Sequence, residues 1–275
     1  MIETPSVRIA EVAFALGDGR RTLFDLACEA VEKVADKRVG AVVAATFSNP
    51  ERFPSLAVRI AARLRLPAST PAFDLQMACS AYPYALYVAG ALSRDLNAKV
   101  LLVDGDAQTR LVDKSDHATG GIFSDAVTAS VISSSAKEDE KSFFDFYSRE
   151  DESLTCSESG PIAMDGMKVF SFVATEVQSF IRSFKTSLPE GDFSFVPHQA
   201  NPYMVRQLAK SLQLDDALLT LNDDIKNPGS CSIPLTLALS RPKPHALLAG
   251  FGAGFSTALA FVNVASVDPY FEMEH

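Results

Sequence analysis

The chain has 275 residues, of which 47% are apolar and 21% are charged, and its formal net charge is −9. This composition is typical of a globular protein and excludes a largely disordered chain or a fibrous repeat. The acidic balance argues against non-specific binding to nucleic acid and against docking on anionic membranes. At this length the chain can form one large domain or two fused halves.

The four cysteines give no sign of a disulfide framework or a structural zinc site, because none has a CxxC or Cys/His spacing. They are Cys28, Cys79, Cys156 and Cys231. The N-terminus lacks a basic segment followed by an apolar core, and no apolar run approaches the roughly 18 residues of a membrane span. We therefore expect a cytoplasmic protein with reduced thiols, no metal and no membrane span.

Apolar strands alternate with helices in the first half of the chain. The predicted elements are a strand at Val39–Thr46, an amphipathic helix at Ser55–Leu66, a strand at Ala72–Leu75, an apolar helix that begins at Cys79, and strands at Lys99–Gly105 and Asp125–Ser133. The acidic, serine-rich stretch from Ala136 to Ser159 then predicts an exposed connection with some aromatic anchors.

The same order of elements returns in the second half. The matching segments are Phe193–Pro197, Pro202–Leu214, Leu219–Leu221, Gly229–Leu239, Ala246–Gly250 and Ser256–Ala265. This internal repeat predicts an α/β fold of two pseudo-symmetric halves, at residues 1–136 and 137–275, each with a mixed sheet. The two apolar helices would meet at the centre, and residues at their N-termini would converge.

Three residues at such junctions are candidates for chemistry. Cys79 begins an apolar helix, where the helix dipole and unpaired N–H groups favour a nucleophilic thiolate that alkylates before the other cysteines. A small core cysteine fits the same context. His198 follows a buried strand, although a lone histidine is more often structural. Asn227 lies in a Pro/Gly-containing loop before the second apolar helix, where asparagine is also a common turn former.

The glycine-rich segment GFGAGFS at residues 250–256 joins two predicted strands. It is not a dinucleotide-binding fingerprint, because a strand and not a helix follows it. It is either a plain hairpin or a turn that directs a backbone N–H at an oxyanion.

Six segments together resemble the β-ketoacyl-acyl carrier protein synthase III family of thiolase-fold condensing enzymes. They are Ala72–Ala78 with Cys79 and its helix, residues 112–129, residues 166–177, VPHQAN at 196–201, KNPGSCSIPL at 226–235 and AGFGAGFSTAL at 249–259. They follow the family order and cover roughly residues 40 to 265. The resemblance implies a thiolase-like fold layered α/β/α/β/α.

The resemblance also implies a catalytic triad of Cys79, His198 and Asn227. Cys79 would carry an acyl group as a thioester. The other two would stabilise the enolate that forms when a malonyl thioester loses carbon dioxide, and this carbanion would attack the acyl group. Backbone N–H groups of Cys79 and Ala253 would form the oxyanion hole. No cofactor is implied, and the substrates would be pantetheine-linked thioesters in fatty acid or polyketide-type biosynthesis.

Four further residues occupy substrate-binding positions of the family. They are Asn201, Phe53, Met167 and Gly252. Asn201 matches a contact to the pantetheine arm. Phe53 matches the residue that closes the acyl pocket of the partner subunit in the family homodimer. A homodimer is therefore expected, with a heterodimer as the alternative.

Several departures from the family pattern affect recognition of coenzyme A. A tryptophan- and arginine-containing segment is missing between Arg8–Gly17 and Thr22, the chain has no tryptophan, and His117 stands for a family arginine. The other departures are Lys226 and Pro228 around Asn227, Ala253 for a glycine and Met167 for an asparagine.

We therefore expect an acyl carrier protein as the main donor, with acyl-coenzyme A as the alternative. Lys168, Arg206 and Lys210 are candidates for its docking, because an acidic enzyme needs a local basic patch to attract an acidic carrier. Two other functions fit the sequence: acyl transfer to an oxygen or nitrogen nucleophile without decarboxylation, and a non-catalytic subunit of a heterodimeric ketosynthase.

Overall fold

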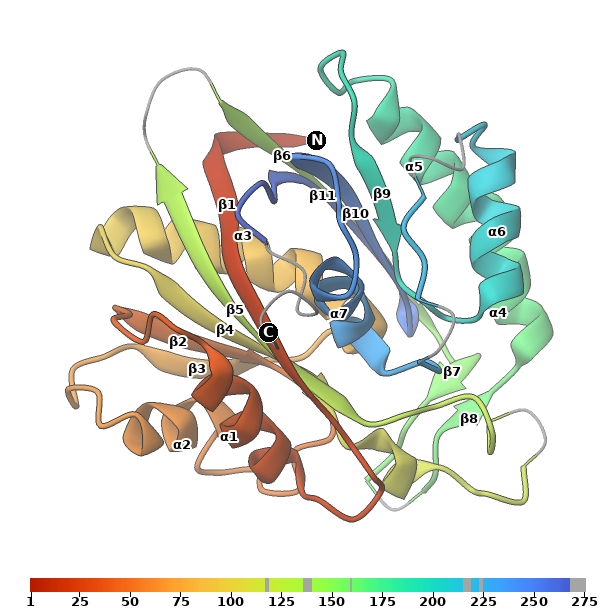
Figure 1. Cartoon of the computed structure of the whole chain (residues 1–275). Coiled ribbons are helices and arrows are strands. Elements are labelled where there is room, and N and C mark those ends of the chain that lie inside the picture. Colours follow the sequence, from red (N-terminus) through yellow and green to blue (C-terminus); the bar gives the residue numbers. More distant parts are fainter. Residues whose placement is uncertain (117–118, 136–139, 159, 215–218, 223–224, 268–275) are drawn as a thin grey trace.

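A nine-stranded mixed sheet runs through the whole molecule (Figure 1). A computed structural model describes the chain except for residues 117–118, 136–139, 159, 215–218, 223–224 and 268–275. Its strands are β1 (Ile2–Leu16), β2 (Ala41–Ala45), β3 (Ala72–Leu75), β4 (Val100–Asp106), β5 (Ala126–Ser135), β6 (Lys141–Asp151), β9 (Ser194–Pro197), β10 (His245–Gly252) and β11 (Gly254–Asn263). A separate short pair comprises β7 (Leu154–Thr155) and β8 (Ala163–Met164). Within the described residues, no helix is long and apolar enough to cross a membrane.

The strand order reproduces the predicted internal repeat. The sheet order is β3-β2-β4-β5-β1-β6-β11-β10-β9, so β1, β5, β4 and β2 of the first half correspond to β6, β11, β10 and β9 of the second. The pairing directions match as well: antiparallel, antiparallel and then parallel. The predicted strand at Leu219–Leu221 is reduced to one parallel bridge from Leu219 to Phe195. The fold-class prediction is confirmed, with the two half-sheets joined where β1 pairs with β6.

The helices form the outer and central layers around the two half-sheets. They are α1 (Leu23–Lys33), α2 (Leu56–Arg63), α3 (Ala81–Leu96), α4 (Gly166–Phe172), α5 (Gln178–Lys185), α6 (Pro202–Ser211) and α7 (Ser232–Ala238). A π-helical segment at Val173–Val177 joins α4 to α5. In Figure 1, α1 and α2 flank one half-sheet and α4, α5 and α6 flank the other.

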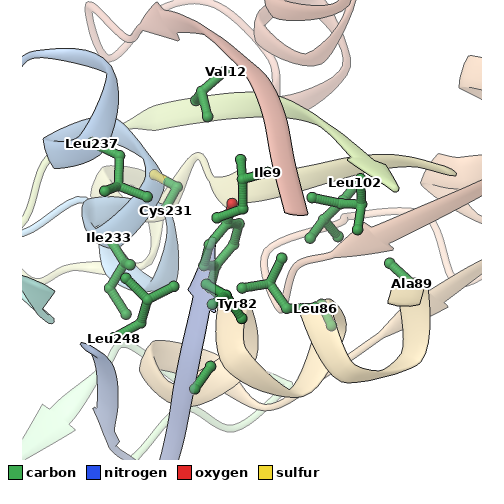
Figure 2. Packing of buried hydrophobic residues seen from close by; sticks show 14 of the residues in the cluster. Ile9, Val12, Tyr82, Leu86, Ala89, Leu102, Cys231, Ile233, Leu237 and Leu248 are labelled. Atoms are coloured by element: carbon green, nitrogen blue, oxygen red, sulfur yellow. The ribbon is translucent and has the colours of Figure 1, made fainter. Parts of the chain in front are cut away.

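The apolar helices α3 and α7 lie between the half-sheets, as the repeat predicts. Figure 2 shows Cys231, Ile233 and Leu237, from α7 and the turn before it, on one side of Tyr82 of α3. These side chains and Ile9 of β1 are completely buried. The three apolar clusters therefore give the layer order α/β/α/β/α.

Strand β6 contradicts the prediction of an exposed connection between Ala136 and Ser159. It is a central strand between β1 and β11. Its adjacent aromatic residues point to opposite faces: Phe143 packs in the outer cluster and Phe144 in the central one. The acidic and serine residues conceal this pattern, because many of them lie on the half-exposed part of the strand. The predicted boundary between residues 136 and 137 lies outside the described residues and stays a prediction.

Candidate active site

Cys79 lies in a single 3₁₀ turn, Ala78–Ser80, between strand β3 and helix α3. Ala78 has a left-handed backbone with φ +43°, a conformation that costs a non-glycine residue about 1 kcal/mol or more. This tight turn places Cys79 at the beginning of α3, with 7% of its surface exposed. The location agrees with the prediction from the sequence.

The ionisation of Cys79 differs from the sequence expectation. Burial raises the pKa of the Cys79 thiol to about 12, and the charges of Asp106 and Asp104 act in the same direction. A hydrogen bond from the local backbone lowers this pKa but does not offset burial. The expectation of a resting thiolate is therefore wrong, because desolvation outweighs the field of the helix N-terminus.

His198 follows the last residue of β9 and is held on two sides. Its Nδ1 lies 2.8 Å from Ser232 Oγ, and its ring meets the Phe251 ring edge-on at 5.4 Å. Ser232 Oγ also accepts the Gln199 N–H at 3.1 Å, so the Ser232 hydroxyl hydrogen is available to Nδ1. Burial lowers the pKa of His198 to about 4. The imidazole is therefore neutral at pH 7 and carries a single N–H; a backbone hydrogen bond with Gly229 raises the pKa of His198 but does not offset burial.

Asn227 has its side-chain amide oriented by the turn that follows it. Oδ1 accepts the Gly229 N–H at 2.9 Å, which leaves the Nδ2 group as a donor. The backbone of Asn227 is fixed separately: its N–H donates to Ile122 O at 3.0 Å, and its carbonyl accepts from Ser124 N at 3.0 Å and Gln108 Nε2 at 2.7 Å. The loop before α7 is thus anchored to the first half of the chain.

The glycine-rich turn between β10 and β11 approaches Cys79 closely. A Cβ atom placed on Gly252 would lie 2.8 Å from Cys79 Cβ and 3.4 Å from Sγ, so a larger residue would not fit here. Ala253, the next residue, lines a cavity together with Cys79. The two residues of the predicted oxyanion hole therefore line the same cavity.

Two cavities adjoin Cys79. The first has a volume of about 610 Å³ and is lined by polar and apolar groups, among them Phe47, Gln76, Gln108, Leu111, Cys156 and Ala253. The second has about 260 Å³, and its lining includes His198, Asn227, Asn201, Met204, Gly252 and Phe251. The structure therefore brings the three predicted catalytic residues together at the second cavity, with Cys79 common to both.

The remaining predicted substrate and docking residues lie farther out. Asn201 lines the second cavity, and its Oδ1 also caps α6 by accepting the Met204 N–H at 2.8 Å. Phe53 and Met167 are among the most exposed apolar side chains, at 85% and 79%. Lys168 is exposed and pairs with Asp165 at 3.5 Å.

The other two docking candidates lie on α6. Arg206 and Lys210 have exposed positions on this helix, whose first turn reaches the second cavity through Met204. His117, which departs from the family pattern, lies outside the described residues. The connection from β1 to α1 is short, because β1 ends at Leu16 and α1 begins at Leu23.

The sequence analysis did not identify two buried carboxyl groups near Cys79. Asp104 and Asp106 of β4 are completely buried, and burial raises the pKa of both carboxyls. Asp104 accepts from Ser230 Oγ, while Asp106 accepts from Thr46 Oγ1 at 2.7 Å. The rule that drew attention to His198, a polar residue at the C-terminal end of a buried strand, applies equally to Asp104 and Asp106.

Two pseudo-symmetric halves that bring a cysteine, a histidine and an asparagine together between buried helices define a thiolase-fold condensing enzyme. Comparison with protein families agrees. Residues 73–151 match the model of 3-oxoacyl-[acyl-carrier-protein (ACP)] synthase III, and residues 188–264 match the model of its C-terminal part. The chain belongs to this family, and it is an acyltransferase of the condensing type.

Individual relatives cover nearly the whole chain. A β-ketoacyl-[acyl-carrier-protein] synthase III of Pseudomonas aeruginosa is 31% identical over 91% of this chain and 83% of its own. The enzyme of the same name from Acholeplasma laidlawii is 28% identical over 88% and 84%. The crystal structure of 3-oxoacyl-(acyl carrier protein) synthase III from Pseudomonas aeruginosa matches with a TM-score of 0.86 and 25% identity, over 96% of this chain and all of that one.

A polyketide enzyme shares the fold as well. The priming β-ketosynthase of the R1128 polyketide pathway matches with a TM-score of 0.76 and 24% identity, over 96% of this chain and 97% of its own. These relatives carry the names of condensing enzymes. They favour neither acyl transfer to an oxygen or nitrogen nucleophile nor a non-catalytic subunit.

Proposed function

We propose that Cys79 accepts an acyl group and that His198 and Asn227 drive its condensation with a malonyl thioester. In the first step the Cys79 sulfur attacks the donor thioester. The donor leaves as a free thiol, and the proton of Cys79 goes to that thiol. This step needs an oxyanion hole, for which the N–H groups of Cys79 and Ala253 are the candidates.

In the second step the malonyl thioester loses carbon dioxide. The electron pair of the broken C–C bond becomes the enolate, whose oxygen accepts hydrogen bonds from His198 and Asn227 Nδ2. A neutral imidazole suits this role, because its pKa of about 4 keeps it a hydrogen-bond donor without a charge. The enolate carbon then attacks the acyl carbonyl, and the Cys79 thiolate leaves.

The observation that carries the proposal is the position of Cys79 at both cavities. His198 and Asn227 line the smaller one, which thereby fits the malonyl thioester and its pantetheine arm. The larger cavity, which Ala253 also lines, then receives the acyl group. Asn201 adjoins the smaller cavity and is the candidate contact for pantetheine.

The test separates the two half-reactions. Protein is incubated with an acyl thioester, and intact mass with peptide mapping locates the acyl group. A malonyl thioester labelled at its free carboxyl carbon is then added, and labelled carbon dioxide is measured. Cys79→Ala should lose acylation, whereas Cys156→Ser, which changes a thiol of the larger cavity, should keep it. An acyl group on another residue, or no release of carbon dioxide from the malonyl thioester, contradicts the proposal.

We also propose that the donor is an acyl carrier protein, consistent with the names of the relatives. The smaller cavity adjoins α4 and α6, because Gly166 and Met204 line it. Lys168, Arg206 and Lys210 are basic residues on these two helices, and they can attract an acidic carrier. Charge reversal at Arg206 and Lys210 should slow acylation by carrier thioesters and leave N-acetylcysteamine thioesters unchanged.

The assembly we propose is a homodimer in which Phe53 enters the larger cavity of the partner subunit. Two features support it. Phe53 is 85% exposed, and β3 is an outer strand of the sheet. An exposed aromatic side chain and an outer strand each favour association with another chain. A monomeric mass by sedimentation, together with full activity, would contradict the homodimer.

A further inference from the structure

Two buried hydroxyl groups connect the Cys79 turn with the glycine-rich turn. Ser80 follows Cys79 directly, and Ser256 lies in β11 just after the glycine-rich turn. Their Oγ atoms are 2.6 Å apart, and their exposed fractions are 0% and 1%. Ser80 Oγ also lies 2.9 Å from Met77 O, and Ser256 Oγ lies 2.8 Å from Ala253 O. A continuous chain of contacts thus runs from the residues before Cys79 to Ala253.

The number of hydroxyl hydrogens determines in which direction the hydrogen bonds between these groups run. Two hydroxyl hydrogens serve three oxygen–oxygen contacts, so only two of the three can be hydrogen bonds at one time. Met77 O already accepts the Ser80 backbone N–H at 3.1 Å. If Ser80 donates to Ser256 and Ser256 donates to Ala253 O, both carbonyls have a donor. This direction gives a donor to the half-buried Ala253 carbonyl as well as to Met77 O, so it is the favoured arrangement.

We propose that Ser80 and Ser256 are positioning residues that hold the N–H groups of Cys79 and Ala253 together as one oxyanion-binding pair. This inference rests on the proposed function, because it assigns both N–H groups to the thioester carbonyl at Cys79. The Ser256 hydroxyl holds the Ala253–Gly254 peptide through the Ala253 carbonyl, and this restrains the adjoining peptide that carries the Ala253 N–H. The Ser80 hydroxyl ties this group to the turn that carries Cys79.

The outer side of the glycine-rich turn is held independently. The Phe255 ring stacks on Phe172 at 4.2 Å with 7° between the planes. The Arg149 guanidinium lies 5.1 Å from the Phe255 ring, and it pairs with Asp151 at 2.6 Å and Glu176 at 3.0 Å. Loss of one inner hydroxyl should therefore leave the turn folded and release only its contact with the Cys79 turn.

The experiment measures acylation of Cys79 in Ser80→Ala, Ser256→Ala and the double variant. The rate at saturating donor should fall about tenfold, less than the roughly 10²–10³ lost when an oxyanion donor itself is removed. The donor KM should stay the same, because the charge on oxygen develops only in the transition state. The double variant should be no slower than either single one, because both hydroxyls belong to one chain. Ser256→Thr retains the hydroxyl and should restore most of the rate.

Ser130→Ala is the matched control. It breaks another buried hydroxyl contact of the α3 layer, from Tyr82 Oη to Ser130 Oγ at 3.0 Å, which does not involve the turn. It should lower the melting temperature by a similar amount and leave acylation unchanged.

Acylation within about twofold of wild type in Ser256→Ala, or an equal loss in Ser130→Ala, overturns the proposal. A wild-type protein that acylates Cys79 but releases no carbon dioxide from malonyl contradicts the proposed condensation and leaves this test intact.

Discussion

Replacement of Asn227 by aspartate tests the malonyl half-reaction with a minimal change of shape. In the native protein, Oδ1 of Asn227 accepts the Gly229 N–H and Nδ2 is left to donate. Aspartate keeps an acceptor for Gly229 but puts a second oxygen in place of Nδ2. The enolate oxygen would then meet an acceptor where it needs a donor.

The expected loss follows from the surroundings of this amide. Asn227 is 7% exposed and adjoins a cavity with a largely apolar lining, so water is a poor substitute for Nδ2. Loss of one preorganised donor costs about 10²–10³ in rate, or roughly 2.7–4 kcal/mol. Repulsion between a carboxylate and the enolate adds to this, so we expect release of carbon dioxide to fall by about 10³-fold. The variant should still fold, because the backbone contacts of Asn227 do not use its side chain.

Two measurements on the same samples decide the result. Carbon dioxide release from a malonyl thioester reports on the enolate, and intact mass reports on acyl-Cys79. Ser55→Ala is the control, because Ser55 caps α2 by accepting the Val58 N–H at 3.3 Å and is not among the residues that line either cavity; its loss should cost about 1 kcal/mol of stability and leave carbon dioxide release unchanged. Equal loss of both half-reactions in folded Asn227→Asp would assign Asn227 to thiol activation. Unchanged release would remove it from the mechanism.

Further predictions concern Cys79, the assembly and the donor. A thiol pKa of about 12 means that acylation should rise about tenfold per pH unit from pH 6 to 9, because the thiolate fraction rises in that proportion; a plateau below pH 8 in stopped-flow acylation would contradict the raised pKa. Exposed Cys156 should react with iodoacetamide at pH 8 before buried Cys79, and peptide mapping that finds Cys79 modified first would refute this order. Phe53→Asp should shift sedimentation toward a monomer, and an unchanged mass would exclude Phe53 from the interface. Carrier-protein thioesters should acylate Cys79 faster than the matching coenzyme A thioesters at equal concentration, and the reverse order would show that the short β1–α1 connection does not alter donor choice.

The sequence predicts the location of the site better than its electrostatics. The repeat places Cys79, His198 and Asn227 near one centre, because it relates the starts of α3 and α7, and the structure places all three at one cavity. The sign of the Cys79 pKa shift was predicted wrongly. A helix N-terminus is visible in the sequence, whereas the depth of burial that outweighs it depends on how α3, α7 and both half-sheets pack.

The missed elements have a related cause. Strand β6 joins the two half-sheets, yet its composition resembles a loop, because its identity as a strand depends on pairing with β1 and β11. The contact of Ser232 with His198 and the contact of Gln108 with the Asn227 carbonyl join residues 34 and 119 positions apart. No local pattern indicates such pairs. The short spacing between Asn227 and Ser232 could have suggested that one segment supports both catalytic candidates.

The pseudo-symmetry explains how one thiol can serve two different steps. Each half has a 3₁₀ turn before its central helix, Ala78–Ser80 before α3 and Gly229–Cys231 before α7. The first turn presents the Cys79 thiol. The second follows Asn227, and its Ser230 hydroxyl is tied to Asp104 of the first half. In the proposed mechanism, equivalent turns thus carry different groups, a nucleophile on one and an enolate donor beside the other. Because the two turns contact each other, the acyl group and the carbanion of the proposed mechanism would form at neighbouring positions.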